Sequence, residues 1–358
     1  MHSRGNLKRG KIRSPKKALP VLFALLVATF LVSLNLGFKQ IPIQTIFDAL
    51  FYGVVDLSPQ STVSYVDRVI IMEIRLPRLI GGILVGSSLG VSGAVLQGIF
   101  RNNLAEPYVT GVSSGAAVGG ASAIVLGFGV TIFGTAAVSV LAFIGAISAV
   151  LLAYNIARVG SRVPVVTLLL SGISVSVFLS AIITLMMVFS GEELRALIFW
   201  LLGSLSSMSW MKISVILPPI ILAFTIIAVY ARDLNVMTLG EDTAHTLGVR
   251  VERSKIVLIF AVSLATALAV SVSGIIGFVG LVVPHITRII FGPDHRVLLP
   301  ASMMGGAIFL MLCDALARTA FRSVGGIGME LPVGVVTALI GGPLFIYLLR
   351  RTKGRYSL

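Results

Sequence analysis

Long runs of apolar residues alternate with short polar segments along the whole chain. A helix needs about 20 apolar residues to cross the hydrocarbon core of a bilayer. Ten segments of this kind occur, at residues 19–37, 79–100, 108–126, 131–157, 164–189, 213–230, 256–272, 274–291, 297–317 and 332–349. Several contain Gly or Pro, which lipid-spanning helices tolerate where neighbouring helices satisfy the freed backbone groups. The pattern therefore predicts an all-α integral membrane protein with about ten packed transmembrane helices.

The composition supports this prediction and excludes other classes. Apolar residues make up 56% of the 358 residues and charged residues only 12%, whereas soluble domains average about 25% charged residues. So few charges cannot cover a soluble surface, and a disordered chain needs low hydrophobicity. The single cysteine, Cys313, excludes a disulfide framework and a thiolate metal cluster. We therefore expect a multi-pass protein of the cell (plasma or inner) membrane.

Basic residues are unevenly distributed, and in membrane proteins they concentrate in cytoplasmic segments. With the N-terminus inside and ten spans, 20 of the 28 Lys and Arg residues fall on the inside. This predicts two cytoplasmic termini, as basic segments 1–18 and 351–358, and one transmembrane domain at residues 19–350. The first apolar run is long and lacks a small-residue cleavage site, so we expect an uncleaved helix. The formal net charge of +14 then reflects orientation and contact with anionic membrane lipid, with no nucleic-acid partner.

Glycine clusters occur in the second and eighth predicted spans, at Gly86, Gly90, Gly93, Gly274, Gly277 and Gly280. Small residues allow transmembrane helices to approach one another closely. Duplicated halves, which are common in transporters, would also place similar glycine patterns in two spans. Both interpretations remain open at the level of the sequence.

Segment 231–255 is the one sizeable charged loop on the predicted cytoplasmic side after the N-terminus. It contains the pattern E-x-x-A-x-x-x-G, formed by Glu241, Ala244 and Gly248. Acidic residues favour a helix N-terminus, and glycine is suited to end a helix. Ala244 and Leu247 can share one face of such a helix. The pattern predicts a short helix that docks in a groove of a soluble partner, with a solvated linker as the alternative.

Motifs for catalysis are missing from the sequence. It contains no phosphate-binding G-x-x-x-x-G-K-[ST], no H-E-x-x-H and no G-x-S-x-G, and its four histidines are scattered. We therefore predict no catalytic residue, metal site or cofactor. Asp314 is the one acid well inside a predicted span, and Arg318 follows one helical turn later. An ion pair between them is expected in preference to a proton relay.

Several motifs occur together and in a characteristic order. They are R-L-P-R at 75–78, the glycines of the second span with Gln97, N-N-L-A-E-P at 102–107, W-L-L-G-S-L at 200–205, L-G-E at 239–241 with L-G-V at 247–249, G-F-V-G-L at 277–281, D-A-L-A-R at 314–318 and E-L-P-V-G at 330–334. On these motifs the chain resembles the permease subunits of ABC importers for iron–siderophore complexes, haem and cobalamin, over roughly residues 60–350. One departure is Asn103, where the family usually has proline.

The resemblance implies a type II ABC importer permease fold with ten helices and both termini in the cytoplasm. It also implies three kinds of protein partner: two ATPase subunits, an extracytoplasmic substrate-binding protein and a second permease subunit, which is either identical, the expected case, or a related chain. The energy for import of a metal chelate would then come from the ATPase subunits. Which chelate is carried does not follow from the sequence. An ion-coupled secondary carrier for a small solute is the alternative, and Asp314 alone supports it.

The resemblance also assigns roles to residues of this chain. The ATPase-coupling helix would lie at 239–249, with Leu239, Gly240, Glu241, Ala244, Leu247 and Gly248 as its matching residues. Docking of the binding protein would involve Arg75, Arg78 and Arg318, which we expect to form a basic outer surface. The cytoplasmic gate would comprise Asn102 and Leu104 and, by a less direct match, Pro164 and Val165.

Overall fold

The computed structural model describes residues 15–37, 39, 41–51, 64–128, 134–160, 162–320 and 330–352, and these are almost entirely helical. The α-helices are α1 (Pro15–Asn35), α2 (Ile43–Phe51), α3 (Tyr65–Val69), α4 (Leu76–Ile99), α5 (Val112–Val125), α6 (Gly134–Ala157), α7 (Val165–Phe189), α8 (Leu194–Leu201), α9 (Trp210–Val229), α10 (Ala231–Met237), α11 (Glu241–Thr246), α12 (Val251–Ser273), α13 (Val279–Phe291), α14 (His295–Thr319) and α15 (Val333–Thr352). A π-helical stretch, Ile70–Arg75, joins α3 to α4, and 3₁₀ turns lie at Pro107–Thr110 and Gly191–Glu193.

Six of the described helices are long and apolar enough to cross a membrane, and four shorter apolar helices accompany them. Each of the ten predicted segments overlaps one of these helices, so the prediction of an all-α membrane bundle is confirmed. One detail differs, because α8 was not predicted. Pro218 and Pro219 lie within an uninterrupted α9, as tolerated in membrane helices. Most of the basic segments 1–18 and 351–358 lies outside the described residues.

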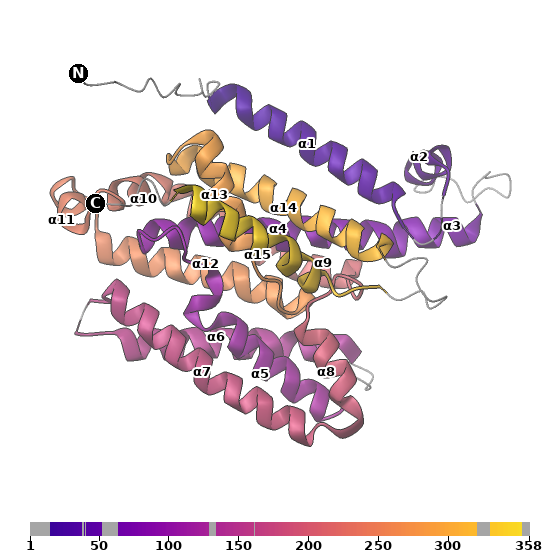
Figure 1. The fold of residues 1–358 in the computed structure, drawn as a ribbon, viewed down its shortest axis with the longest axis horizontal. Helices are drawn as coiled ribbons and strands as arrows, with labels where there is room; N and C mark the ends of the chain where they lie inside the picture. Colours follow the sequence, from indigo (N-terminus) through magenta and orange to yellow (C-terminus); the bar gives the residue numbers. More distant parts are fainter. Residues whose placement is uncertain are drawn as a thin grey trace.

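Helix α4 forms the centre of the bundle. In the most apolar stretch of the continuous helix from Tyr65 to Ile99, 89% of the residues are buried, against 22% for α7. Helices α12, α13 and α14 pack directly against α4. In Figure 1, α4 and α12 run through the middle, with α1 and α14 on one side and α5, α6 and α7 on the other. Much of the apolar surface of α7 is therefore left for lipid or another protein.

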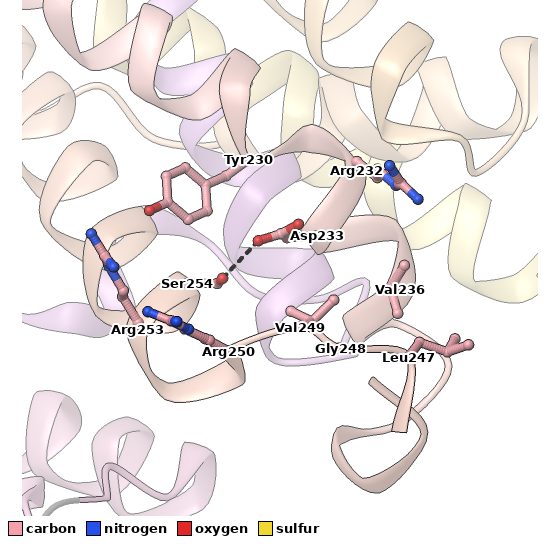
Figure 2. A pocket seen from close by; sticks show the side chains of 10 residues that line it. All are labelled: Tyr230, Arg232, Asp233, Val236, Leu247, Gly248, Val249, Arg250, Arg253 and Ser254. Carbon is pink, nitrogen blue, oxygen red and sulfur yellow. Dashed lines mark hydrogen bonds between the residues drawn. The ribbon is translucent and has the colours of Figure 1, made fainter. Parts of the chain in front are cut away.

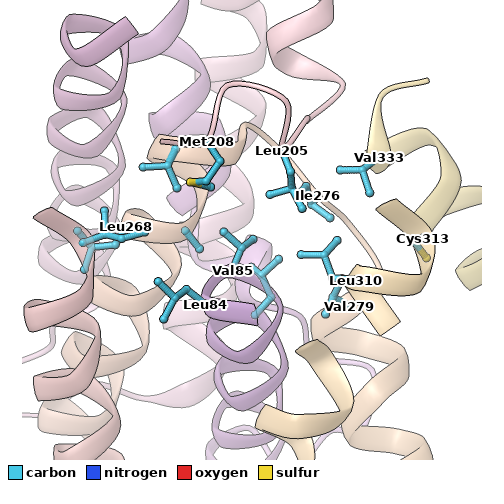
Figure 3. Close-up of a cluster of buried hydrophobic side chains, with 14 of the residues drawn as sticks. Leu84, Val85, Leu205, Met208, Leu268, Ile276, Val279, Leu310, Cys313 and Val333 are labelled. Carbon is cyan, nitrogen blue, oxygen red and sulfur yellow. The ribbon is translucent and has the colours of Figure 1, made fainter. Parts of the chain in front are cut away.

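A large buried cluster joins the helices around α4 toward the end that is predicted to face outward. Figure 3 shows side chains from α4, α12, α14 and α15 meeting those of the turn at residues 202–209. Leu205 and Met208 of that turn are buried beside Leu84 and Val85 of α4. Cys313 is one of the buried residues of this cluster. The turn after α8 is thereby fixed against the central helix.

Glycines allow the central helices to approach at backbone distance. A Cβ added to Gly93 of α4 would overlap the carbonyl oxygen of Gly280 in α13. Gly86 of α4 and Gly306 of α14 face one another in the same way, because a Cβ on either would overlap the carbonyl of the other. The glycine clusters of the second and eighth spans therefore meet in space, as expected of helix-packing sites.

Two of the predicted spans begin later than expected. Helix α5 starts at Val112, after the 3₁₀ turn at Pro107–Thr110, and α13 starts at Val279, after the non-helical residues 274–278. Polar contacts replace the missing helical hydrogen bonds: the carboxylate of Glu106 accepts from the backbone N–H of Phe278 at 2.8 Å, and the Tyr108 hydroxyl oxygen accepts from the N–H of Ile276 at 3.0 Å. Phe278 has a positive φ of 67°, which interrupts the helix before α13. Non-helical backbone at this depth is stable because protein surrounds it.

Candidate functional site

The predicted coupling helix is present as α11, at the end of the bundle that is predicted to face the cytoplasm and is called the inner end below. It begins at Glu241, directly after Gly240 with a φ of 122°. It ends at Thr246, and Gly248 then adopts a φ of 81°, a conformation that glycine accommodates best. The N–H of Gly248 donates to the carbonyl of His245 at 3.0 Å. The predicted start and end of this helix are confirmed.

Helix α11 has one buried residue and two prominent exposed leucines beside it. Ala244 is completely buried against Met237 and Val251. Leu239 and Leu247 are 66% and 60% exposed. The expectation that Ala244 and Leu247 share a face is wrong, because Leu247 belongs to the turn that leaves the helix. Ala244 anchors α11, and the leucines present apolar surface outward.

A pocket of about 690 Å³ lies between α10, the turn after α11 and the start of α12. Figure 2 shows its lining, which includes the exposed guanidinium groups of Arg232, Arg250 and Arg253. The one acid in the lining, Asp233, accepts a hydrogen bond from the Ser254 hydroxyl at 2.9 Å. The pocket therefore carries positive charge beside Leu247, which is one of its lining residues.

Lys255 connects this region to the start of α7, and the sequence analysis did not single it out. Its side chain is 3% exposed. Its Nζ lies 3.2 Å from Oε1 of Glu241, 2.7 Å from Oε1 of Glu252 and 3.4 Å from the carbonyl oxygen of Val163. The sequence gave only the i,i+3 spacing of Glu252 and Lys255, whereas the contacts with Glu241 and Val163 depend on the tertiary structure.

The predicted gate residues occupy two segments that meet at the inner end. The Asn102 side chain accepts a hydrogen bond from the N–H of Leu104 at 2.9 Å, and Leu104 is 49% exposed. Pro164 directly precedes α7, and Val165 packs against a buried cluster that also contains Ala105. The structure therefore brings both segments to one apolar cluster.

Asn103, the departure from the family pattern, has a specific contact. Its side-chain oxygen accepts a hydrogen bond from the guanidinium of Arg288 in α13. Proline could not make this bond, because its side chain has no polar atom. The contact ties the loop after α4 to α13.

A polar contact also fixes α10 against α14. The carboxylate of Asp294 accepts from the N–H of Arg296 at 3.0 Å and from the Asn235 amide at 2.6 Å. These two hydrogen bonds hold the pKa of Asp294 below its usual range, because they stabilise the ionised form. Asp294 thereby caps the N-terminus of α14.

The three outer arginines are buried, and their partners lie within the chain. Arg75, Arg78 and Arg318 are only 4%, 6% and 7% exposed. Asp314 pairs with Arg78 at 3.0 Å and with Arg318 at 3.0 Å, which confirms the predicted ion pair of α14 and adds a second arginine. Arg78 also pairs with Glu330 at 2.7 Å. The expected exposed basic surface is therefore wrong for this structure.

The remaining donors of this arginine cluster bind the end of α1. Arg75 donates to the carbonyl oxygens of Leu34 at 2.8 Å and Asn35 at 3.2 Å. Arg318 donates to the carbonyl of Leu36 at 2.8 Å. Since the last carbonyls of a helix have no partner within the helix, the arginines satisfy the outer end of α1. Sequence reasoning missed this structural role, because it depends on contacts with distant segments.

Clusters suited to metal binding are not found in the described part of the chain, where no three His, Cys, Asp or Glu side chains gather closely enough to hold an ion. The features at hand are instead a short exposed helix, two meeting loop segments and a buried arginine cluster, arranged around ten apolar helices. These features define the membrane subunit of a multi-pass transporter.

The chain belongs to the FecCD transport family, whose profile matches residues 25–351. It is 45% identical to the cobalamin import system permease protein BtuC of Halobacterium salinarum over 80% of this chain and 75% of that protein. It is 36% identical to the hemin transport system permease protein HmuU of Yersinia pestis over 96% of this chain and 98% of that protein.

A solved structure agrees with this assignment. It is described as an inward-facing conformation of a metal-chelate type ABC transporter, is 32% identical, covers 94% of this chain and 99% of its own, and has a TM-score of 0.79. The predicted membership in the family of ABC importer permeases and the membrane location are therefore confirmed. The roles of individual site residues remain predictions.

Proposed function

We propose that this chain is the permease subunit of an ATP-driven importer for a metal chelate, a cobalamin, haem or ferric siderophore. Two ATPase subunits would bind α11 from the inside, and an extracytoplasmic binding protein would deliver the chelate. A second, identical permease subunit would complete the pathway. The observation that carries this proposal is α11 itself, which is anchored by Ala244 and exposes Leu239 and Leu247 beside a basic pocket.

The surface around α11 suits a soluble partner with an apolar groove and acidic groups near it. Leu239 and Leu247 offer apolar area, and Arg232, Arg250 and Arg253 offer charge that steers association. The rival proposal, an ion-coupled carrier, rested on Asp314. Asp314 is 1% exposed and pairs with two arginines, which supports a structural role for it.

The proposed gate and the second subunit are supported by exposure in the single chain. Asn102 and Leu104, which follow α4, and Pro164, which precedes α7, are exposed at the inner end. A second copy that packs along the exposed surface of α7 would place the two sets of gate residues opposite one another. The pathway between two copies would then be lined by apolar and small polar side chains, which suits a large chelate that keeps its own ligands.

Reconstitution in liposomes tests the function. The permease would be assembled with its ATPase and binding protein, and uptake of radiolabelled cyanocobalamin, haemin and ferrichrome would be followed. We expect uptake of one of these chelates to require ATP hydrolysis and to persist when the proton gradient is collapsed. Uptake that follows the proton gradient without the ATPase would support the secondary carrier instead.

Gly248→Pro is the variant arm of this assay. Proline fixes φ near −65° and lacks an N–H, whereas Gly248 has a φ of 81° and donates to His245. We expect uptake to be abolished while the protein still inserts into the membrane, because the turn after α11 lies outside the bundle. Glu241→Lys, which places a second cation beside buried Lys255, is expected to give the same result. Normal chelate-stimulated ATP hydrolysis and uptake in both variants would contradict a coupling role for α11.

Docking of the binding protein on Arg78 remains a proposal, and the structure suggests how to test it. Reversing Arg78 would also break its buried pair with Asp314, so the result would not report docking alone. Glu330 is 44% exposed and pairs with Arg78, and it therefore competes with any acid that a partner brings. We expect Glu330→Gln to strengthen capture of the binding protein at low salt, with a difference that shrinks as salt rises. Unchanged or weaker capture would limit Arg78 to its internal role.

A further inference from the structure

Lys255 is a buried charge in the second turn of α12. Lysine is almost never fully buried unless it is paired, and an ammonium group has three hydrogen-bond donors. All three have an oxygen within reach here: Oε1 of Glu241, Oε1 of Glu252 and the carbonyl oxygen of Val163. The three oxygens belong to α11, α12 and the segment before α7. A single side chain thus joins three elements of the inner end.

The segment before α7 is held through two backbone groups of Val163, its carbonyl oxygen and its N–H. The carbonyl oxygen of Val163 faces Lys255, and the N–H of Val163 donates to Oε2 of Glu252 at 3.1 Å. Pro164 follows with a φ of −62°, and α7 begins at Val165. Proline has a fixed φ, which stiffens the backbone between Val163 and α7. We therefore expect a displacement of Val163 to move the start of α7.

The link to α11 is of a different kind from its apolar anchor. Ala244 packs against Val251 and Met237, which ties α11 to α12 and α10. Glu241 of α11 contacts Lys255, and Lys255 in turn contacts the carbonyl oxygen of Val163 in the segment before α7. Charged hydrogen bonds from a buried ammonium group are both strong and directional. A movement of α11 can therefore be transmitted through these hydrogen bonds, whereas apolar surfaces in contact can slide past one another.

We propose that Lys255 is the positioning residue that transmits movement of α11 to residues 162–165 and thus to the inner end of α7. The inference rests on the proposed function, because it takes α11 as the segment that an ATPase moves. In this arrangement the ATPase displaces α11, Glu241 pulls the ammonium group, and the Val163–Pro164 segment follows. Opening at the inner end is thereby linked to the nucleotide cycle without a direct contact between the ATPase and α7.

Lys255→Met tests this link by removing the charge while keeping a long unbranched side chain. Glu241 and Glu252 have side chains that are 43% and 27% exposed, so water can solvate both carboxylates and the fold should persist. We expect the number of chelate molecules imported per ATP hydrolysed to fall by about tenfold, a typical coupling between two sites. Lys255→Arg, which keeps charge and donors, should retain most of the wild-type ratio.

Lys212→Met is the matched control, because Lys212 lies in α9 at the opposite end of the bundle and donates to the Ser207 hydroxyl. It should leave the ratio of import to hydrolysis at the wild-type value. If Lys255→Met fails to assemble with the ATPase, Lys255→Gln replaces it. Its shorter amide can reach Glu252 on the same helix but not Glu241 and Val163 together.

Distance measurements distinguish transmission from a merely structural role. Cys313 is the single cysteine, so a Cys313→Ser background allows one spin label per chain, at Thr243→Cys in α11 or at Val166→Cys in α7. Both positions are exposed. In the wild-type complex ATP should change the distance between the two copies of either label. In Lys255→Met the α11 label should still respond, and the α7 label should not.

Three outcomes decide the matter. Loss of the response at Val166 alone, together with the lower import ratio, supports transmission through Lys255. Wild-type responses at both labels and a wild-type ratio in Lys255→Met would overturn it. If the α11 label of the unmodified complex fails to respond to ATP, the proposed function itself fails, and the inference falls with it.

Discussion

Gly93→Ala is expected to prevent normal packing of the bundle. A single methyl group at this position would overlap the backbone carbonyl of Gly280, and α4 belongs to the most buried of the six long apolar helices described. Overpacking of a well-packed interior typically costs 1–3 kcal/mol. Here the obstacle is backbone, which cannot rotate away as a side chain can, so we expect a loss of about 3 kcal/mol or more. The amount of protein recovered from the membrane and its half-life on heating in detergent would measure it.

Gly277→Ala provides the matched control for this prediction. Gly277 lies three residues from Gly280 in sequence, yet a Cβ added to it would meet no atom within 4 Å, and its φ is not positive. We expect its stability to stay within about 0.5 kcal/mol of the wild type, as for most substitutions that touch nothing. Equal heat resistance of Gly93→Ala and Gly277→Ala would show that α4 and α13 do not cross at the described distance.

Asp314→Asn is expected to loosen the outer end of the bundle. Asp314 is 1% exposed and neutralises two buried guanidinium groups, those of Arg78 and Arg318. Breaking a buried ion pair by removing one partner costs about 3–5 kcal/mol, since a charge is left buried without compensation. Arg78 would keep Glu330, whereas Arg318 would keep only carbonyl oxygens. Faster hydrogen exchange or proteolysis around residues 33–36 at the end of α1 would reveal the loss.

The same substitution at the other end of α14 serves as the control. Asp294 is exposed and caps the helix by accepting from the N–H of Arg296. Asparagine caps helices about as well as aspartate, so Asp294→Asn should change stability by less than about 0.5 kcal/mol. If Asp314→Asn also leaves stability and the exchange of α1 unchanged, the arginine cluster does not hold α1 in place.

Local patterns were sufficient for several features of the inner end. The acidic pair at 241–242 and the glycine at 248 predicted where α11 begins and ends, because helix ends depend on residues within one turn. The same holds for the pair of Asp314 and Arg318, whose spacing of four residues places them on one helix face. These predictions needed no information about neighbouring helices, and the structure confirms them.

Other expectations were wrong because they depended on distant segments. Arg75, Arg78 and Arg318 looked like an exposed basic surface, yet Arg78 finds its partners 236 and 252 residues further along the chain. Leu247 was placed beside Ala244, although the turn at Gly248 carries it away from the anchored face. For Lys255 only the pair with Glu252 follows from local helix spacing, since Glu241 and Val163 lie in α11 and in the segment before α7.

By itself the sequence determined that this protein is a membrane bundle, where its ten apolar segments lie and which of its motifs match an importer permease. Hydropathy and motif order are properties of consecutive residues, and the bilayer acts on each apolar segment separately. The tertiary structure alone decided which charges are buried and which helices touch. Gly93 with Gly280 and Arg78 with Asp314 are examples of such contacts. Burial and pairing there result from packing between segments that lie far apart in the sequence.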